Sequence, residues 1–200
     1  MALLLIVLLF CTTTLYSVEI SKEPLSYTKK LKSRSVKRIS LIVLHSTELP
    51  TMKLTRTYAQ TIRYHKGVGV SGHFYIDKKG KVYQYLDTNR IALHTRGYNA
   101  RSIGIELLND GRYPSWYEIA SQKVDDPYTP EQLKSLEMLV EKLKLQYPTI
   151  KYLARHSDLD KRKIKSSDHP KKMIQRKIDP GPLFPYSTFS KKVDLICIKK

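Results

Sequence analysis

Short apolar segments separated by polar ones run through most of the chain, and their lengths suit the strands of a small sheet. Residues 39–44 form a β-branched and leucine-rich run, which is typical of a buried strand. Residues 72–77 and 81–86 flank Lys78-Lys79-Gly80, and this arrangement predicts a hairpin. Residues 102–108 have the same apolar character, so the pattern predicts a further strand there.

Two segments have the spacing of helices. Residues 55–65 place Tyr58, Ile62 and His65 on one face, which predicts a helix with His65 in its packing surface. The second helix begins at Thr129-Pro130-Glu131-Gln132, where a threonine cap, an early proline and a capping-box glutamine favour initiation. Its buried stripe, which extends toward Pro148, consists of Leu133, Leu136, Val140 and Leu143.

Strands interleaved with helices indicate an α/β (α+β) fold, with helices flanking a central mixed β-sheet. A chain of 200 residues usually forms one domain, and we place that domain at 39–190. Residues 18–38 are polar and basic and are interpreted as a basic linker, and residues 191–200 as a C-terminal tail. Residues 109–128 predict a long surface loop, a kind of segment that is often functional.

The first seventeen residues differ from the rest. Residues 2–11 are continuously apolar, but a membrane-spanning helix needs about twenty such residues. The run fits a signal peptide cleaved before Val18, although no Lys or Arg precedes it, and an uncleaved N-terminal anchor is the alternative. Both predict an exported protein, in the periplasm or cell envelope or secreted. Cleavage would leave Cys197 without an intramolecular partner.

The charge balance narrows the class of partner. Lys and Arg total 36 against 18 Asp and Glu, so the formal net charge is +18. Such a chain is attracted to polyanions, which include nucleic acid, anionic membranes and acidic cell-wall polymers. Charge alone does not choose among them.

Three residues suggest metal chemistry when they are taken together. His45 ends an apolar run, His156 follows a short predicted strand over 151–154, and Asp179 precedes Pro180. Singly, each has an ordinary interpretation: a hydrogen-bonded histidine, or an aspartate that caps a turn. Together they supply two imidazoles and a carboxylate, a set that suits zinc with one open position for water.

Other catalytic patterns are missing from the sequence. It contains no HExxH pair, no CxxC, no Walker A pattern and no GxSxG. Thermolysin-like chemistry, structural cysteine zinc sites and P-loop nucleotide binding therefore have no support.

Five blocks in order resemble the type 2 zinc amidases, the N-acetylmuramoyl-L-alanine amidases that share a fold with peptidoglycan recognition proteins and phage amidase lysozymes. The resemblance extends over residues 39–189. The blocks are Leu41-Ile42-Val43-Leu44-His45-Ser46-Thr47, Val70-Ser71-Gly72-His73-Phe74-Tyr75-Ile76, Ser102-Ile103-Gly104-Ile105-Glu106-Leu107, His156-Ser157-Asp158, and Arg176-Lys177-Ile178-Asp179-Pro180-Gly181-Pro182-Leu183-Phe184-Pro185.

The resemblance implies one zinc ion per chain, bound in a surface cleft by His45, His156 and Asp179. It gives Glu106 the role of activating the attacking water and Lys177 that of stabilising the oxyanion. Taken alone, the alternation of Glu106 with Ile103, Ile105 and Leu107 favours an exposed position on a half-buried strand. The phage branch carries a catalytic tyrosine where this chain has Gly72, which favours the branch that uses the glutamate.

Further residues are candidates for the substrate cleft. His73 and His94 are expected to line it or to support the zinc ligands, with a purely structural role as the alternative. Trp116, in the loop over 109–128, is a candidate wall residue whose alternative role is packing. The stretch between His156 and Asp179 is longer than in compact relatives, and it is either a solvated basic loop or a cation-rich rim. Asp168 and His169, within it, are alternative ligands.

The expected function is hydrolysis of the amide bond between N-acetylmuramic acid and L-alanine in peptidoglycan or muropeptides. We expect a monomer, with membrane association only through an uncleaved N-terminus. The first rival is a non-catalytic peptidoglycan-binding protein, which commonly lacks a metal ligand. The second is a nucleic-acid-binding protein, which has no motif here beyond its charge.

Overall fold

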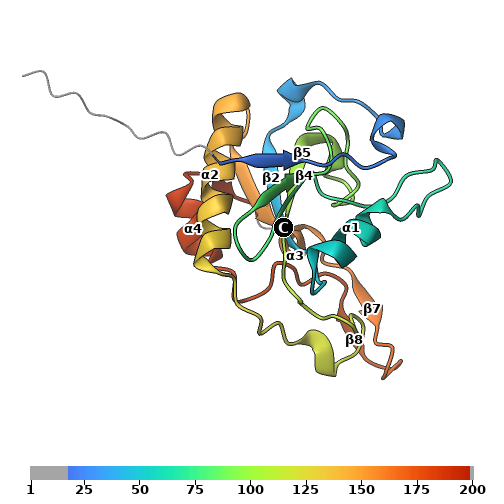
Figure 1. Cartoon of the computed structure of the whole chain (residues 1–200). Coiled ribbons are helices and arrows are strands. Elements are labelled where there is room, and N and C mark those ends of the chain that lie inside the picture. Colours follow the sequence, from blue (N-terminus) through green and yellow to red (C-terminus); the bar gives the residue numbers. More distant parts are fainter. Residues whose placement is uncertain (1–17, 199–200) are drawn as a thin grey trace, which may run out of the picture.

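The computed structural model describes residues 18–198, so the expected signal peptide or anchor over 1–17 lies outside the described residues. The strands are β1 (Ile20–Lys22), β2 (Leu41–Ser46), β3 (Phe74–Ile76), β4 (Val82–Gln84), β5 (Ser102–Leu107), β6 (Tyr152–Arg155), β7 (Lys163–Lys165), β8 (Met173–Gln175) and β9 (Ile196–Cys197). The α-helices are α1 (Met52–Gln60), α2 (Pro130–Gln146), α3 (His156–Leu159) and α4 (Tyr186–Lys192) (Figure 1). Within the described range, no helix is long and apolar enough to cross a membrane.

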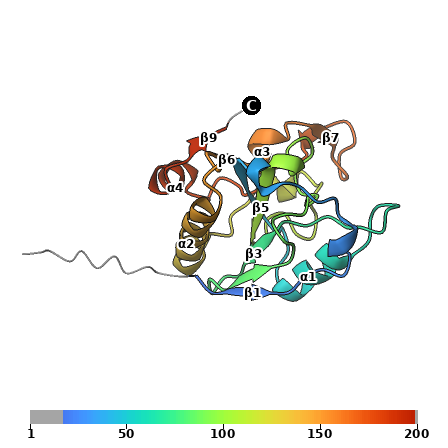
Figure 2. The ribbon, with the colours of Figure 1, turned by 90° about the horizontal axis from the view of Figure 1, so that it is seen from above.

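One mixed sheet organises the domain. Its seven described strands run in the order β1-β4-β3-β5-β2-β6-β9, with β7 and β8 forming a separate pair. Strand β2 is parallel to both β5 and β6, whereas β3 and β4 are antiparallel. Helices α2 and α4 lie on one side of the sheet and α1 on the other (Figures 1 and 2). The predicted α/β fold with a helix-flanked mixed sheet is therefore confirmed.

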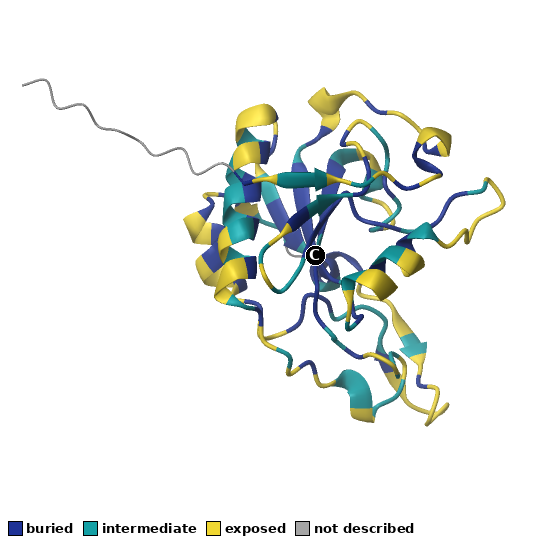
Figure 3. Ribbon diagram, viewed as in Figure 1, coloured by how far each residue is buried: buried dark blue, intermediate teal, exposed yellow. Residues whose placement is uncertain are grey.

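The two faces of the central strands differ in chemistry. All six residues of β2 are buried, and Figure 3 shows the central strands as the most buried part of the molecule. Ile42 and Leu44 share the main core cluster with Leu136 and Val140 of α2. Because side chains alternate along a strand, His45 projects from the opposite face. The sheet is thus anchored by α2 on one face and is free to carry polar groups on the other.

The strongest local signals in the sequence correspond to observed elements. Strands β3 and β4 form the predicted hairpin, with Phe74 paired to Gln84. Helix α2 starts with the expected capping box, in which the Thr129 side chain accepts from the Gln132 backbone and the Gln132 side chain from the Thr129 backbone. Strands β2, β5 and β6 also lie where the apolar runs predicted them.

Helix α1 begins and ends earlier in the chain than the helix that the sequence pattern predicts over 55–65. Helix α1 spans Met52–Gln60 because the Thr51 side chain caps it by accepting from the Leu54 backbone N–H. Its buried positions are Thr55 and Ala59, whereas Tyr58 and Ile62 are 42% and 50% exposed. His65 is also exposed, on the turn after the helix, so its predicted packing role is wrong.

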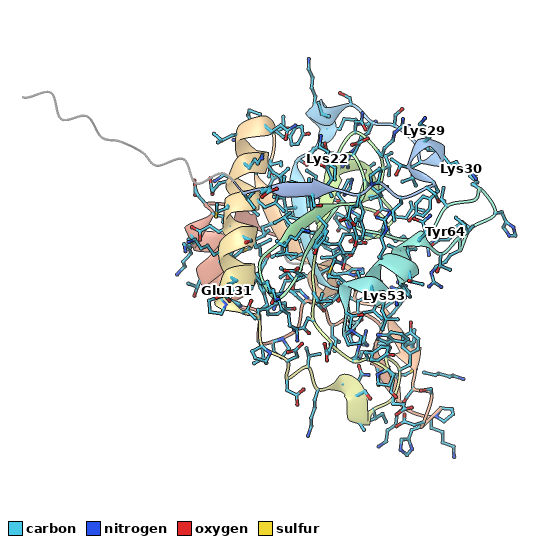
Figure 4. All side chains as sticks on the ribbon, viewed as in Figure 1. Lys22, Lys29, Lys30, Lys53, Tyr64 and Glu131 are labelled. Carbon is cyan, nitrogen blue, oxygen red and sulfur yellow. The ribbon has the colours of Figure 1, made fainter. Side chains whose placement is uncertain are left out.

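Residues 18–38 are not the loose basic linker that their lysines suggested. Strand β1 pairs in parallel with β4, and Leu25, Tyr27 and Leu31 belong to a second core cluster. The basic side chains that dominate the composition, Lys22, Lys29 and Lys30 among them, lie on the surface (Figure 4). Apolar residues too few to form a visible pattern therefore attach this arm to the domain.

Arg34 fixes the end of this arm inside the protein. Its guanidinium donates to the backbone carbonyls of Thr88, Asn99 and Ser102, at 2.7–2.9 Å. The side chain is buried, and burial lowers the pKa of Arg34 to about 10, which leaves it charged at neutral pH. Arg34 therefore connects the arm to the start of β5 and to the segment that precedes it.

The expected C-terminal tail over 191–200 also belongs partly to the fold. Val193 and Leu195 are buried, and β9 pairs in parallel with β6 through Tyr152↔Ile196. Strand β9 has only two residues, and its neighbours include lysines, so the sequence pattern resembled a solvated end.

Replacing Arg34 tests whether residues 18–38 are an ordered part of the domain or a loose linker. Arg34→Met would leave three backbone carbonyls, two of them in buried hydrogen bonds, without this donor, and we expect a loss of about 3 kcal/mol in the free energy of unfolding. Arg38→Met, at an exposed position of the same arm, should change it by less than about 0.5 kcal/mol. Urea unfolding of both variants tests this, and equally small losses would contradict an anchoring role for Arg34.

Candidate functional site

Three buried side chains from separate segments meet at the carboxyl end of the sheet. His45 ends the apolar part of β2, and His156 directly follows β6, the parallel neighbour of β2. Nδ1 of His45 lies 3.0 Å from Asp179 Oδ2, and Nδ1 of His156 lies 3.1 Å from the same oxygen. The candidate ligand atoms of the three residues are all within 4.8 Å of one another. The structure thus brings together the residues for which the sequence predicted a metal role.

The loop that carries Asp179 is tied to the histidine segment through its backbone. The Ser157 N–H donates to the Asp179 carbonyl at 3.0 Å, and the Tyr128 hydroxyl donates to the Pro180 carbonyl at 2.6 Å. These bonds hold the loop after β8 against α3 and against the start of α2. Asp179 can therefore approach His156 although twenty-three positions separate them in sequence.

The donor set fits a metal ion. Asp179 Oδ1 is buried and has no hydrogen-bond partner among the described residues, so one carboxylate oxygen is left for a cation. Burial and the nearby His156 lower the pKa of His45 to about 4, so this imidazole is neutral at pH 7, as a ligand must be. Burial alone would raise the pKa of Asp179, but His156 and Lys177 hold it well below the ordinary value. Two imidazoles and an ionised carboxylate are a ligand set that suits zinc.

Glu106 lies on the strand beside His45. The register pairs His45 of β2 with Glu106 of β5, which places the two side chains on the same face. Glu106 Oε1 is 4.0 Å from His45 Nδ1, and its side chain is 14% exposed, so it is not the solvent-facing residue that alternation alone favoured. Burial, followed by the charge of Asp179, raises the pKa of Glu106 well above its usual value.

Gly72 gives Glu106 its space. A Cβ atom at position 72 would lie 2.8 Å from Glu106 Cγ and 3.1 Å from the Gly104 carbonyl oxygen. Any larger side chain there, the tyrosine of the phage branch included, would therefore collide with the glutamate in this backbone. The glycine and the glutamate form a matched pair.

Lys177 approaches the site from the segment after β8. Its Nζ is 4.0 Å from Asp179 Oδ1, and its side chain is 28% exposed. Burial would lower the pKa of Lys177, but the carboxylates of Asp179, Glu48 and Glu106 together hold it above the ordinary value. The site therefore combines a fixed cation with two carboxylates whose pKa values are shifted in opposite directions, an arrangement suited to separate roles.

A cleft of about 760 Å³ opens over these groups. Its lining includes the predicted cleft residues His94 and Trp116, together with Glu106 and Lys177. Tyr58 and Tyr64 contribute from α1 and the turn that follows it. Tyr58, the aromatic residue of α1, thus contributes to a cleft wall together with Tyr64.

His73 does not line the cleft. It is fully buried, and its Nδ1 accepts from the Gly104 N–H at 3.1 Å while Nε2 lies 3.1 Å from the Arg90 carbonyl. Burial and the charge of Arg34 lower the pKa of His73 to about 3. His73 thus makes the contacts expected of the structural alternative, since it joins β5 to the loop before it.

The loop over 109–128 forms a wall that a buried ion pair holds in place. Arg112 donates to both oxygens of Glu48, at 2.6 and 3.0 Å, and also to the Gln175 and Arg176 carbonyls. Trp116 Nε1 donates to the Glu48 carbonyl at 3.1 Å. Sequence reasoning missed Arg112 and Glu48, because nothing local marks either residue as buried.

The insertion between His156 and Asp179 contains the hairpin of β7 and β8 beside the cleft. Asp160 accepts from Arg162 at 2.7 Å and from Arg176 at 2.6 Å, and these contacts hold its pKa below the usual range. Asp168 and His169 are exposed and lie outside the metal-compatible group. The two alternative ligands are therefore not brought to the site, and Asp168 instead accepts from the Ile119 N–H.

The fold is thus an α/β domain that carries a buried, metal-compatible His-His-Asp cluster at the carboxyl edge of its mixed sheet. Residues 35–182 match the family model described as N-acetylmuramoyl-L-alanine amidase, so the chain belongs to that family. It is 26% identical to the N-acetylmuramoyl-L-alanine amidase AmiD of Escherichia coli (strain K12) over 176 residues, which are 82% of this chain and 57% of AmiD. It is 30% identical to an endolysin of Klebsiella phage KP32 over 97 residues, covering 47% of this chain and 60% of the endolysin.

Solved structures show the same fold. The complex of E. coli AmiD with anhydro-N-acetylmuramic acid-L-Ala-D-gamma-Glu-L-Lys aligns with a TM-score of 0.60 and 26% identity, covering 80% of this chain and 59% of that one. The endolysin LysCS from Clostridium intestinale URNW aligns with a TM-score of 0.62 and 24% identity. The alignment covers 90% of this chain and 99% of LysCS. The chain spans less than two thirds of the length of the curated relatives it matches.

The Glu48–Arg112 pair should be essential to the fold of the cleft wall. Arg112→Met would leave a buried carboxylate unpaired, and we expect a loss of about 3–5 kcal/mol in the free energy of unfolding. The double variant Glu48→Leu/Arg112→Met removes both charges and should recover much of that loss. Urea unfolding checks both values. A double variant as unstable as Arg112→Met would show that the charge pairing is not what matters.

Proposed function

We propose that this protein is a zinc-dependent amidase that hydrolyses the bond between N-acetylmuramic acid and L-alanine of the stem peptide in peptidoglycan or its fragments. The observation that carries the proposal is the meeting of His45, His156 and Asp179 beside Glu106 at the base of a cleft. Membership of the family supports it, as does the muramyl peptide bound in the AmiD complex.

His45, His156 and Asp179 would hold the zinc ion. A zinc ion in such a site supplies Lewis-acid chemistry that polarises an amide carbonyl and activates water. The chain's own residues provide the rest of the proposed mechanism. Burial keeps the His45 imidazole neutral, and Ser157 fixes the loop that presents the carboxylate of Asp179.

Glu106 would carry the proton. Its carboxylate accepts a proton from the attacking water, and the raised pKa of Glu106 lets the protonated acid persist long enough to donate to the leaving amine nitrogen. Lys177 would place its ammonium group beside the carbonyl oxygen as negative charge develops there. One preorganised donor of this kind contributes about 3 kcal/mol to stabilising the transition state.

The surroundings of the site suit a large polar substrate with carboxylates. Trp116, Tyr58 and Tyr64 offer apolar surfaces in the cleft, and Arg162 and Arg176 lie at its rim with Asp160 between them. The strongly positive net charge suits an acidic cell-wall polymer as the substrate. We therefore propose that a monomer acts in the periplasm or cell envelope, with residues 1–17 as signal peptide or anchor.

The decisive experiment is hydrolysis of purified muropeptides followed by mass spectrometry. We expect free stem peptide from the zinc-loaded protein, and no product after zinc is removed with EDTA. Glu106→Gln should lower kcat by about 10²–10⁴-fold because the proton carrier is lost while its volume is kept. Intact muropeptides from a folded, zinc-loaded protein would overturn the amidase proposal in favour of a peptidoglycan-binding role.

Zinc binding can be tested separately from catalysis. Competition with a chromophoric chelator should give one zinc per chain, and Asp179→Ala should weaken binding by at least about 100-fold, since a charged ligand is lost. Asp158→Asn is the matched control. Asp158 is also a buried aspartate, in α3, but its carboxylate pairs with Arg155 and is not a candidate ligand. Equal weakening by both substitutions would argue against Asp179 as a ligand.

A further inference from the structure

The second ring nitrogen of His45 lies in an enclosed set of hydrogen bonds. His45 Nε2 is 3.0 Å from His94 Nδ1 and 3.3 Å from Thr95 Oγ1, on the side of the ring away from Asp179. His94 Nε2 in turn is 3.1 Å from Ser102 Oγ. No such partner is recorded for Nε2 of His156 among the described residues. The arrangement therefore concerns only one of the two candidate histidine ligands.

The direction of these bonds follows from the serine. The Ser102 hydroxyl has a single hydrogen, which it donates to the Tyr98 carbonyl at 2.9 Å. Ser102 Oγ can therefore only accept from His94, so the proton of the neutral His94 ring is on Nε2. Nδ1 of His94 is consequently a lone-pair acceptor, and it faces His45.

His45 must then carry its proton on Nε2. If that nitrogen were unprotonated, its lone pair would meet the lone pair of His94 Nδ1 at 3.0 Å. The Thr95 hydroxyl, 3.1 Å from His94 Nδ1, can donate to only one of the two nitrogens and cannot remove this conflict. With His45 in the Nε2–H form, its Nδ1 lone pair points at Asp179 Oδ2, and a cation between them satisfies both atoms.

The backbone holds His94 in this position. The Asn99 side-chain oxygen accepts from the N–H groups of His94 and Thr95, at 3.1 and 2.7 Å. A Cβ atom at Gly104 would lie 2.7 Å from His94 Cγ, so the glycine in β5 leaves the space that the imidazole fills. Both observations show a histidine whose ring orientation is built into the fold.

We propose that His94, oriented by Ser102, is a positioning residue that fixes the tautomer and ring plane of His45 so that Nδ1 is ready to bind metal. The inference rests on the metal site of the proposed function and adds two residues to it. Partners of this kind typically change metal affinity by about 10–100-fold, because they remove the cost of selecting the tautomer.

Two substitutions at position 94 separate hydrogen bonding from packing. His94→Leu keeps much of the volume but offers no acceptor, whereas the Asn Oδ1 of His94→Asn can replace Nδ1 as the acceptor. At the serine, Ser102→Ala removes the group that sets the His94 tautomer. Ser190→Ala is the matched control, because Ser190 is also buried and donates to a backbone carbonyl, that of Ser187 in α4.

The primary measurement is the zinc dissociation constant of each full-length variant by chelator competition. We expect His94→Leu to weaken zinc binding by about 10–100-fold, His94→Asn to recover most of that loss, and Ser102→Ala to fall between them. Ser190→Ala should bind as the parent does. Long-range ¹⁵N–¹H correlation spectra of the zinc-loaded parent should show His94 as the Nε2–H tautomer.

Several results would overturn the inference. His94→Leu binding zinc as tightly as the parent would do so, as would equal losses in His94→Leu and His94→Asn, which would indicate packing alone. An Nδ1–H tautomer for His94 would contradict the bond directions directly, whatever the affinities. Failure of the proposed function looks different: the parent itself would bind no zinc, or would bind it and cleave no muropeptide.

Discussion

The register between β2 and its two parallel neighbours is the constraint on which the rest of the structure depends. It sets His45 opposite Glu106 on one side and continues from Leu44↔Arg155 toward His156 on the other. A slip of one residue would turn His45 toward α2 and bury it among apolar side chains. The apolar set that includes Ile42 and Ile103 prevents the slip, because those residues must face the helix. Core packing on one face thus determines the chemistry on the other.

Buried polar contacts hold the loops around this edge of the sheet. Unlike contacts in an apolar core, they destabilise the protein when one partner is missing. Arg34, the Glu48–Arg112 pair and the Tyr128 hydroxyl each connect segments far apart in sequence. A charged group taken out of water stabilises the structure only when every partner is in place. These contacts determine the positions of loops, because each one holds a loop that the hydrogen bonds of the main sheet do not.

Local pattern was sufficient for the elements that fold by local rules. The capping box at Thr129 and the apolar runs of β2 and β5 are visible in sequence because spacing alone specifies them. The grouping of His45, His156 and Asp179 could also be predicted, since each residue lies within a recognisable block. Strands β1 and β9 could not be predicted from the sequence. Two or three residues among lysines acquire strand structure only by pairing with β4 and β6. Arg34 and Arg112 were missed for a related reason, since their partners are distant backbone carbonyls and a carboxylate.

Two glycines show why the candidate site residues alone did not predict the whole site. Gly104 leaves room for the His94 ring, and Gly72 leaves room for the side chain of Glu106. In both cases the position next to a functional side chain is kept empty, so the choice of residue at one site is coupled to the choice at another. A tyrosine at position 72 and a glutamate at position 106 would compete for one volume in this backbone. A side chain at position 72 and the glutamate at position 106 therefore exclude each other for steric reasons in this backbone.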